Sequence, residues 1–471
     1  MRVINEVMAD PRRFATMNNE QVYTMPVEDV DRFQQHWLQR RFEEMRPRVK
    51  VLDRLATDLN MDEVGGFQDA PSLFLPHTFY KSYSASFIEK KQYAKLSAWL
   101  STLTTLNLTD VDVSQCDSLD SWLGALMRET QLRPLCSSGT GGKISFFPRT
   151  VAEEYVFIRN YYLFNGGFRG ELDSELESGK VDYFTPWPVA SGRHNLPVLF
   201  NLLREHLYKD RPGEHVHTLG KGHWSADMLW FSGRLRAAER KGEVDLIEMT
   251  PELAALREQL AADARATAEN IEPFLEKLMI GQRGKKVFLF ATPKELYALA
   301  LACRERGLKA EFAPDAYIFS PGRPGSKGHV MPETWLEECK EIFPYPYQGV
   351  YGMTESTGHA RLCAAGHYHM PPWIFLALLD PDTGVAFPRS GVQTGRLALF
   401  DILATAYWGG AISGDRVTID WNGGCPCGRV GPFMHDDIVR YMNLRDDDKI
   451  TCAKSADAYA KTVDFVLGEV D

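Results

Sequence analysis

Apolar residues recur at helical spacing in the first quarter of the chain. From residue 29 to 59, and again from residue 87 to 103, apolar positions return every three or four residues among charged ones. This spacing predicts amphipathic helices, and we expect residues 1–130 to form a mainly helical N-terminal segment whose aromatic side chains fill a core. Examples in the first helix are Phe33, Trp37, Phe42 and Met45.

The pattern changes to alternating strands and helices further along. Residues 287–291 form a short apolar run of the buried-strand type, and Thr292, Pro293 and Glu295 supply an N-cap, a proline at N1 and a capping-box glutamate. The helix should end at Gly307, and residues 310–313 could start the next strand. Thr250-Pro251 opens another helix by the same logic. This order favours an α/β fold with a parallel sheet.

Composition and charge exclude several classes of protein. The chain has 471 residues, 44% of them apolar, which is enough for two or three domains. A formal net charge of −10 argues against nucleic-acid binding. The sequence contains no signal-peptide pattern and no apolar run long enough to span a membrane, so we expect a cytoplasmic protein with no membrane partner. The eight cysteines should then be thiols or metal ligands.

The segment 137–143, Ser-Ser-Gly-Thr-Gly-Gly-Lys, has the composition of a phosphate-binding loop. Small and hydroxylated residues let backbone N–H groups close around phosphate oxygens, and Lys143 adds a positive charge. A P-loop would need glycine at position 137 and serine or threonine at 144, where the chain has Ser137 and Ile144. The Walker interpretation is therefore excluded.

Two later segments complete a known pattern. Tyr351-Gly-Met-Thr-Glu355 and Gly414-Asp415 follow the loop in order, about 210 and 60 residues apart. Together with residues 137–143 they resemble the adenylate-forming superfamily of acyl-CoA synthetases. The most similar branch is that of phenylacetate-CoA ligase and coenzyme F390 synthetase, with a secondary likeness to acyl-protein synthetases. The resemblance covers Phe74–Thr451. It implies an α/β fold, with the large N-terminal domain of these enzymes as the core at residues 131–443.

The resemblance also implies roles for particular residues. Thr354 would bond the α-phosphate, Glu355 would hold Mg²⁺ and Lys143 would be catalytic. Tyr351 would stack on adenine and Asp415 would bond the ribose. The full set of residues expected to bind the nucleotide is Ser137, Ser138, Gly139, Thr140, Gly141, Gly142, Gly322, Arg323, Tyr351, Gly352, Asp415 and Arg445.

Cysteines and histidines near the end of this region suggest a zinc site. Cys425 and Cys427 are one residue apart, and Cys363 precedes His367 and His369. Three sulfurs and one imidazole form the usual closed shell of structural Zn²⁺. The resemblance favours His369 as the fourth ligand. The alternative is a buried turn that holds reduced thiols without a metal.

The last residues resemble the hinge that precedes a mobile C-terminal lid in the superfamily. The hinge-like segment is 444–449, and residues 444–471 are expected to form a hinge and the remnant of a truncated lid domain with one short helix at 456–467. The lid's catalytic lysine has no clear counterpart. Cys452 is a candidate acyl acceptor, against the alternative of an inert thiol.

An aromatic region suggests the acid-binding pocket. We expect Phe164, Phe168, Trp187 and Gly349 to line it, which suits an aromatic or bulky hydrophobic acid because apolar burial is worth about 25 cal/mol per Å². The same aromatics are equally suited to filling a core.

The sequence therefore predicts ATP-dependent activation of such a carboxylic acid as an acyl-AMP. The acyl group would pass to CoA, a carrier-protein thiol or a partner enzyme. The expected cofactors are ATP, Mg²⁺, structural Zn²⁺ and CoA, and a homodimer is left open. Two alternatives remain: a catalytically weakened nucleotide-binding protein with a regulatory or scaffold role, and an amide-forming ligase.

Overall fold

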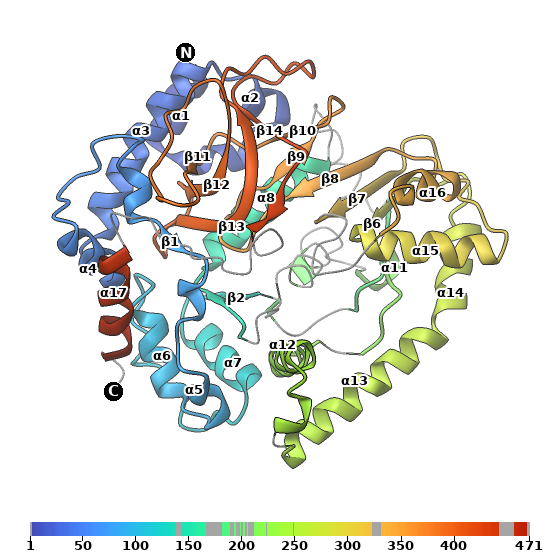
Figure 1. The fold of residues 1–471 in the computed structure, drawn as a ribbon. Coiled ribbons are helices and arrows are strands. Elements are labelled where there is room, and N and C mark those ends of the chain that lie inside the picture. Colours follow the sequence, from blue (N-terminus) through green and yellow to red (C-terminus); the bar gives the residue numbers. More distant parts are fainter. Residues whose placement is uncertain are drawn as a thin grey trace. The chain divides into compact units, whose positions relative to one another are not determined.

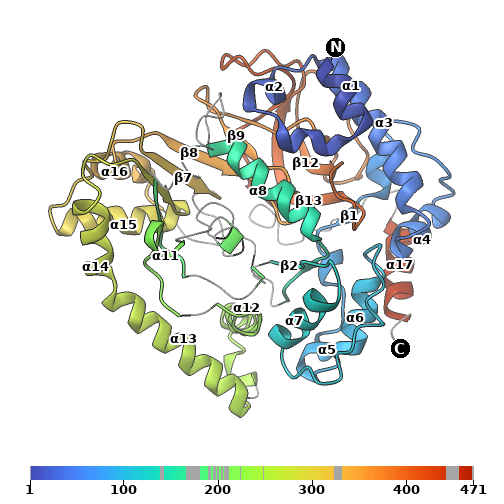
Figure 2. The same ribbon diagram turned by 180° about the vertical axis from the view of Figure 1, so that it is seen from behind.

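The chain forms two compact units in the computed structural model. The first unit contains Met1–Leu135, Ser145–Gly170 and Met353–Asp471, and the second contains Cys136–Ile144 and Glu171–Gly352. The ribbon is drawn in Figure 1, and from behind in Figure 2. The described residues are 2–137, 143–165, 181–188, 193–194, 198, 201–202, 205, 212–222, 224–247, 249–322, 331–441 and 456–468.

The helices predicted from apolar spacing at residues 29–59 and 87–103 are present in the first unit. The longest, α3, buries Phe33, Trp37 and Phe42 at helical spacing, with exposed fractions of 5% or less. These aromatics therefore belong to the core. The helices are α1 (Arg2–Ala9), α2 (Asn19–Tyr23), α3 (Val27–Met45), α4 (Lys50–Asp58), α5 (Ala85–Glu89), α6 (Tyr93–Ser101), α7 (Leu119–Glu129), α8 (Val151–Asn165) and α17 (Ala456–Gly468), with short 3₁₀ turns η1 (Pro11–Thr16), η2 (Ala70–Leu73) and η3 (Phe79–Lys81).

The sheet of the first unit is mainly antiparallel. Its strands follow the order β11-β12-β13-β14-β10-β9, and β1 pairs in parallel with β13. β15 pairs with β13 so that Arg440 lies opposite Asp415. The strands of this sheet are β1 (Leu75–Pro76), β9 (Ala360–Leu362), β10 (His367–His369), β11 (Ile374–Leu379), β12 (Val392–Asp401), β13 (Gly410–Asp420), β14 (Phe433–His435) and β15 (Val439–Arg440). A separate two-stranded sheet is formed by β2 (Leu135–Cys136) and β3 (Phe146–Phe147).

Polar side chains of α3 attach the N-terminal helices to this sheet. Gln34 Nε2 donates to the carbonyl oxygen of Pro372 at 2.8 Å, and Arg41 Nε donates to that of Ile402 at 2.9 Å. Both side chains are buried. Because these bonds join residues more than 300 positions apart, the first and last parts of the chain share one core.

The C-terminal helix predicted at residues 456–467 is confirmed as α17 and packs against α4 (Figure 1; Figure 2). Thr462 and Val466 are fully buried, and the guanidinium of Arg54 lies 5.9 Å from the ring centroid of Phe465. This helix is therefore part of the first unit's core.

We expect Val466→Ala to lower the free energy of unfolding by about 2 kcal/mol, because it removes two buried methyl groups and leaves a cavity. Urea denaturation measures the change. Asp464→Ala, at an exposed position on the same helix, is the control and should change stability by less than about 0.5 kcal/mol. Equal stabilities of the two variants would contradict the packing of α17 on α4.

The second unit contains a fully parallel sheet of order β5-β4-β6-β7-β8. The strands are β4 (Asp182–Thr185), β5 (Val216–Thr218), β6 (Val287–Phe290), β7 (Tyr317–Pro321) and β8 (Tyr347–Tyr351). The helices are α11 (Pro212–His215), α12 (Ala226–Lys241), α13 (Pro251–Glu269), α14 (Ile271–Leu275), α15 (Pro293–Glu305) and α16 (Trp335–Ile342), with a 3₁₀ turn η5 (Val244–Leu246) and a π-helical turn η6 (Glu276–Ile280).

Local signals predicted three of this unit's elements correctly. The buried strand β6, the capping box of Thr292 and Glu295, and the start of α13 after Thr250 all lie where the sequence predicts them. The strand expected from residues 310–313 was wrong, since β7 begins only at Tyr317. Ala310 and Ala313 instead bond to Ile342 and Lys285, outside any strand ladder, and Pro314 follows at once.

The predicted α/β fold class is confirmed. Strands and helices alternate in the second unit, and the chain contains both parallel and antiparallel strand pairs. Among the residues that the structure describes, no helix has the length and apolar character needed to cross a membrane. The predicted boundaries at residues 130 and 443 remain predictions.

Candidate functional site

The Thr354–Glu355 motif lies on a loop. β8 ends at the buried Tyr351 in the second unit, Gly352 is exposed, and the first unit resumes at Met353. Residues 352–359 contain turns and bends but no helix. Both Thr354 and Glu355 are partly exposed.

Buried side chains of the first unit hold the backbone of this loop. Arg149 Nη2 donates to the carbonyl oxygens of Thr354, at 2.8 Å, and of Ser356. Tyr407 Oη donates to the carbonyl oxygen of Glu355 at 3.2 Å. Two further bonds fix Thr357, one from its N–H to Asp401 Oδ2 at 2.6 Å and one from Asn160 Nδ2 to its carbonyl at 2.8 Å.

The electrostatic environment of Glu355 perturbs its carboxyl group. Burial raises the pKa of Glu355 and the charge of Asp415 raises it further, whereas the loop backbone, Arg440 and Arg149 lower it. The net pKa lies above the ordinary value of 4.5. Ionisation of this carboxyl group is unfavourable in the ligand-free protein, and a cation placed beside it would stabilise the ionised form.

Asp415 lies close enough to Glu355 to act on its charge. The Asp415 carboxylate is 5% exposed, and its Oδ1 accepts from Arg440 Nε at 2.9 Å. Strand pairing explains this contact, since β15 places Arg440 directly opposite Asp415 on β13. Arg440 thus pairs with the acidic residue of one motif, Asp415, and its charge also acts on Glu355, the acidic residue of a motif 60 residues away in sequence.

The remaining nucleotide candidates lie in the second unit or outside the described residues. Ser137 and Lys143 are partly exposed, and Gly322 follows β7 with a φ of +90°, a conformation that favours glycine. Ser138, Gly139, Thr140, Gly141, Gly142, Arg323 and Arg445, and the acceptor candidate Cys452, lie outside the described residues.

The pocket candidates that can be placed belong to the core of the second unit. Trp187 is 6% exposed, its indole N–H donates to Glu295 Oε1 at 2.5 Å, and its ring contacts Phe290. Gly349 is buried in β8 opposite Ser320. Phe168 and the side chain of Phe164 lie outside the described part of the chain. The contacts of Trp187 are those of a core residue, and a role in a pocket stays a prediction.

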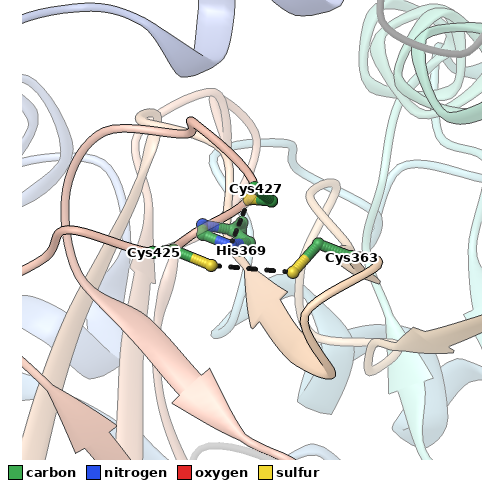
Figure 3. A group of neighbouring side chains, drawn as sticks. All are labelled: Cys363, His369, Cys425 and Cys427. Atoms are coloured by element: carbon green, nitrogen blue, oxygen red, sulfur yellow. Dashed lines mark hydrogen bonds between the residues drawn. The ribbon is translucent and has the colours of Figure 1, made fainter.

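Four side chains predicted as metal ligands gather in the first unit. The ligand atoms of Cys363, His369, Cys425 and Cys427 all lie within 4.8 Å of one another. Figure 3 shows the four side chains pointing towards a common centre. The sheet brings them together, because β9 and β10 form a hairpin that carries Cys363 and His369, while β10 also pairs with β14, which follows the Cys425–Cys427 turn.

The spacing of these atoms fits a tetrahedral metal. Bonds of about 2.3 Å to sulfur and 2.0 Å to nitrogen require S···S distances of about 3.8 Å and S···N distances of about 3.5 Å. The Cys363 and Cys425 sulfurs are 3.7 Å apart, and Cys427 Sγ lies 3.4 Å from His369 Nε2. The donor set therefore matches a closed shell with no open position.

The protonation of His369 and Cys363 suits metal binding, whereas burial raises the pKa of the Cys425 thiol to about 12. Burial lowers the pKa of His369 to about 3, helped by Arg429 and His367, so its imidazole is neutral. Burial raises the pKa of the Cys363 thiol, but the N–H groups of His367 and Ala365 and the other two thiols outweigh it and lower the pKa overall. His367 Nδ1 contacts Cys425 Sγ at 3.2 Å but is not among the four converging ligands.

Sequence analysis missed the residues that hold the motif loop. Arg149, Asn160, Asp401 and Tyr407 lie outside the three motifs, and each reaches the loop only through the tertiary fold. Arg440, which pairs with Asp415, was missed as well. A charged residue within an apolar stretch, as Arg149 is after Phe146-Phe147-Pro148, was the one local signal.

The chain was compared with family models and with the sequences of known proteins. No family model matches the chain. A curated relative, the long-chain-fatty-acid–luciferin-component ligase of Vibrio harveyi, is 24% identical over 197 residues, which is 40% of this chain and 47% of the relative. The chain thus matches about half the length of that protein.

Solved structures were also compared. An open conformation of 2-hydroxyisobutyryl-CoA ligase in complex with 2-HIB-AMP and CoA aligns with a TM-score of 0.46 at 15% identity, covering 92% of this chain and 73% of the other. The amide bond synthetase McbA from Marinactinospora thermotolerans aligns with a TM-score of 0.32 at 16% identity, covering 64% and 48%.

The sequence match to a fatty-acid ligase agrees with the motifs at residues 137–143, 351–355 and 414–415. The predicted resemblance is therefore supported: this chain is similar to the adenylate-forming ligases.

Proposed function

We propose that the protein activates a carboxylic acid as an acyl-AMP at the expense of ATP. The observation that carries this proposal is that Glu355 and Asp415 lie in one unit and act on each other's charge, with Arg440 paired to Asp415, because the superfamily pattern assigns these two carboxylates to the same nucleotide. A sequence relative described as a long-chain-fatty-acid ligase supports the class of substrate.

In the proposed reaction, a carboxylate oxygen attacks the α-phosphorus of ATP, the bond to the bridging oxygen of the β-phosphate breaks, and pyrophosphate leaves. Thr354 is proposed to bond the α-phosphate and Asp415 the ribose hydroxyls. Residues 137–143 are proposed to bind phosphates, with Lys143 offsetting their charge, and Tyr351 to contact the adenine.

Mg²⁺ is the cation proposed for Glu355. Magnesium favours carboxylate and phosphate oxygens and retains several waters, so one protein carboxylate is a sufficient ligand. Glu355 fits this role because it is partly exposed, carries a raised pKa and lies on a loop whose backbone is fixed. When bound, the ion would neutralise charge on the phosphates.

The acid is proposed to be aromatic or otherwise bulky and hydrophobic. In the second half-reaction a thiol sulfur attacks the acyl carbon, AMP leaves, and the thiol proton passes to a base. CoA, a carrier protein and a partner enzyme are the acceptors to be distinguished. An amine acceptor would instead give an amide.

The cluster of Cys363, His369, Cys425 and Cys427 is proposed to hold a structural Zn²⁺. Support comes from the converging ligand atoms and from distances that match tetrahedral zinc. The ion would connect the β9–β10 hairpin to the turn before β14, at a position where no side of the shell is left for substrate.

Acid-dependent ATP–pyrophosphate exchange tests the proposed function. The purified protein is incubated with ATP, Mg²⁺, labelled pyrophosphate and a panel of straight-chain, branched and aryl acids. We expect label to enter ATP only with an accepted acid. Absence of exchange with every acid, in a protein that binds Mg·ATP, would instead support the nucleotide-binding regulatory alternative.

A further inference from the structure

Arg149 is a fully buried arginine beside the motif loop. It follows β3 and precedes α8, and its side chain is 0% exposed. Its Nη2 donates to the carbonyl oxygens of Thr354 and Ser356, and its Cζ lies 5.2 Å from the ring centroid of Phe157. The arginine therefore contacts the carbonyl groups of the residues before and after Glu355.

Burial of this guanidinium is costly for the fold. Its Nε and Nη1 atoms have no hydrogen-bond partner among the described residues. A buried charge that is only partly paired costs more than it contributes, and an apolar side chain of similar size is often more stable in such a place. A role in packing alone does not account for arginine at this position.

We propose that Arg149 is a positioning residue that fixes Glu355 for binding the divalent cation. The proposal rests on the proposed function. Arg149 holds the carbonyls of residues 354 and 356, and Tyr407 holds that of residue 355, so three consecutive carbonyls are fixed by side chains of the first unit. The Glu355 side chain then projects from a backbone that cannot rotate freely.

Arg149 also acts on Glu355 through its charge. It lowers the pKa of Glu355, against the opposing effects of burial and Asp415. The other groups that act on or contact Glu355 are Arg440 on β15, Asp415 on β13, Tyr407 after β12 and Tyr80 in η3. Loss of Arg149 should therefore loosen the loop and make Glu355 harder to ionise.

Hydrogen exchange in the ligand-free protein tests the positioning directly. In Arg149→Met, we expect the amides of residues 353–360 to exchange at least about tenfold faster than in the wild type. Arg159→Met is the matched control, because Arg159 on α8 also bonds a backbone carbonyl, that of Ala15, away from the loop. Wild-type exchange in Arg149→Met would overturn the proposal.

Kinetics separate positioning from simple stabilisation. In pyrophosphate exchange, Arg149→Met should need about tenfold more Mg²⁺ for half-maximal rate. The acid limb of its pH–rate profile should move to higher pH. Arg149→Lys keeps the positive charge but lacks the planar guanidinium group. The acid limb of its pH–rate profile should therefore stay in place, while the amides of its loop should exchange faster than in the wild type. Unchanged Mg²⁺ dependence in both variants would refute the role.

The two hypotheses fail differently. A wild type without pyrophosphate exchange would remove the proposed function, and hydrogen exchange would still decide whether Arg149 holds the loop. If Arg149→Met does not fold, Arg149→Lys carries the same comparison, and wild-type loop exchange in that variant would overturn the proposal.

Discussion

Glu355→Gln is expected to reduce pyrophosphate exchange at least about 100-fold while raising the thermal stability of the ligand-free protein. The loss follows because an amide is a much poorer ligand for Mg²⁺ than a carboxylate, and removing one preorganised electrostatic group commonly costs 10²–10³ in rate. Exchange at saturating ATP and acid, with Mg²⁺ varied, measures the first effect.

The gain in stability follows from the raised pKa. Because the folded pKa of Glu355 lies above its unfolded value, the stability that the neutral carboxyl contributes is present at low pH and lost as the pH rises through the folded pKa. At pH 7 the ionised group therefore destabilises the empty protein. Glutamine removes that charge and should raise the midpoint of thermal unfolding at pH 7, with a smaller difference at pH 4.

Glu20→Gln, at an exposed position on α2, is the control for this experiment and should leave both quantities unchanged. The pH profile of the wild type adds a check, since its acid limb should lie above the ordinary glutamate pKa of 4.5. A Glu355→Gln variant that keeps wild-type exchange would remove Glu355 from the proposed site.

Loss of the proposed zinc from the cluster of Cys363, His369, Cys425 and Cys427 should have a second large effect, a decrease in thermal stability. We expect the wild type to retain about one zinc per chain after dialysis, and Cys425→Ser/Cys427→Ser to retain almost none. The variant should unfold at a lower temperature because metal binding contributes directly to the folding free energy, and because the partly buried Cys363 thiol and the buried His369 imidazole would lose their ion.

Elemental analysis and thermal unfolding, with and without a strong chelator, measure these changes. Cys116→Ser is the control, since Cys116 is a partly exposed thiol of the same unit outside the cluster. Chelation should lower the midpoint for the wild type and for Cys116→Ser but have no further effect on the double variant. Full zinc retention by the double variant would rule out these ligands.

Local chemistry explains which parts of the structure were predictable. The capping box at Thr292 and the helix at residues 456–467 depend on neighbours a few positions away, so the sequence reveals them. The four residues Cys363, His369, Cys425 and Cys427 were also singled out as one cluster, and the structure brings their ligand atoms together, while their role as metal ligands stays a prediction. The resemblance supplied the choice of His369.

Contacts between distant segments were not predictable in the same way. Nothing near Arg149 in the sequence indicates that its partners are the carbonyls of residues 354 and 356, and Asp401 binds Thr357 from 44 positions away. The strand expected at residues 310–313 failed because an apolar run does not show whether a neighbouring strand is in register.

The discontinuous first unit has a consequence for synthesis on the ribosome. Residues 171–352, which provide most of the second unit, leave the ribosome before residues 353–471, which complete the first. Its parallel sheet is then able to form while α3 still lacks its partners in the last part of the chain, such as Trp408, which packs against Phe42. Nascent chains that stall before residue 353 would therefore expose this apolar face and depend on chaperones.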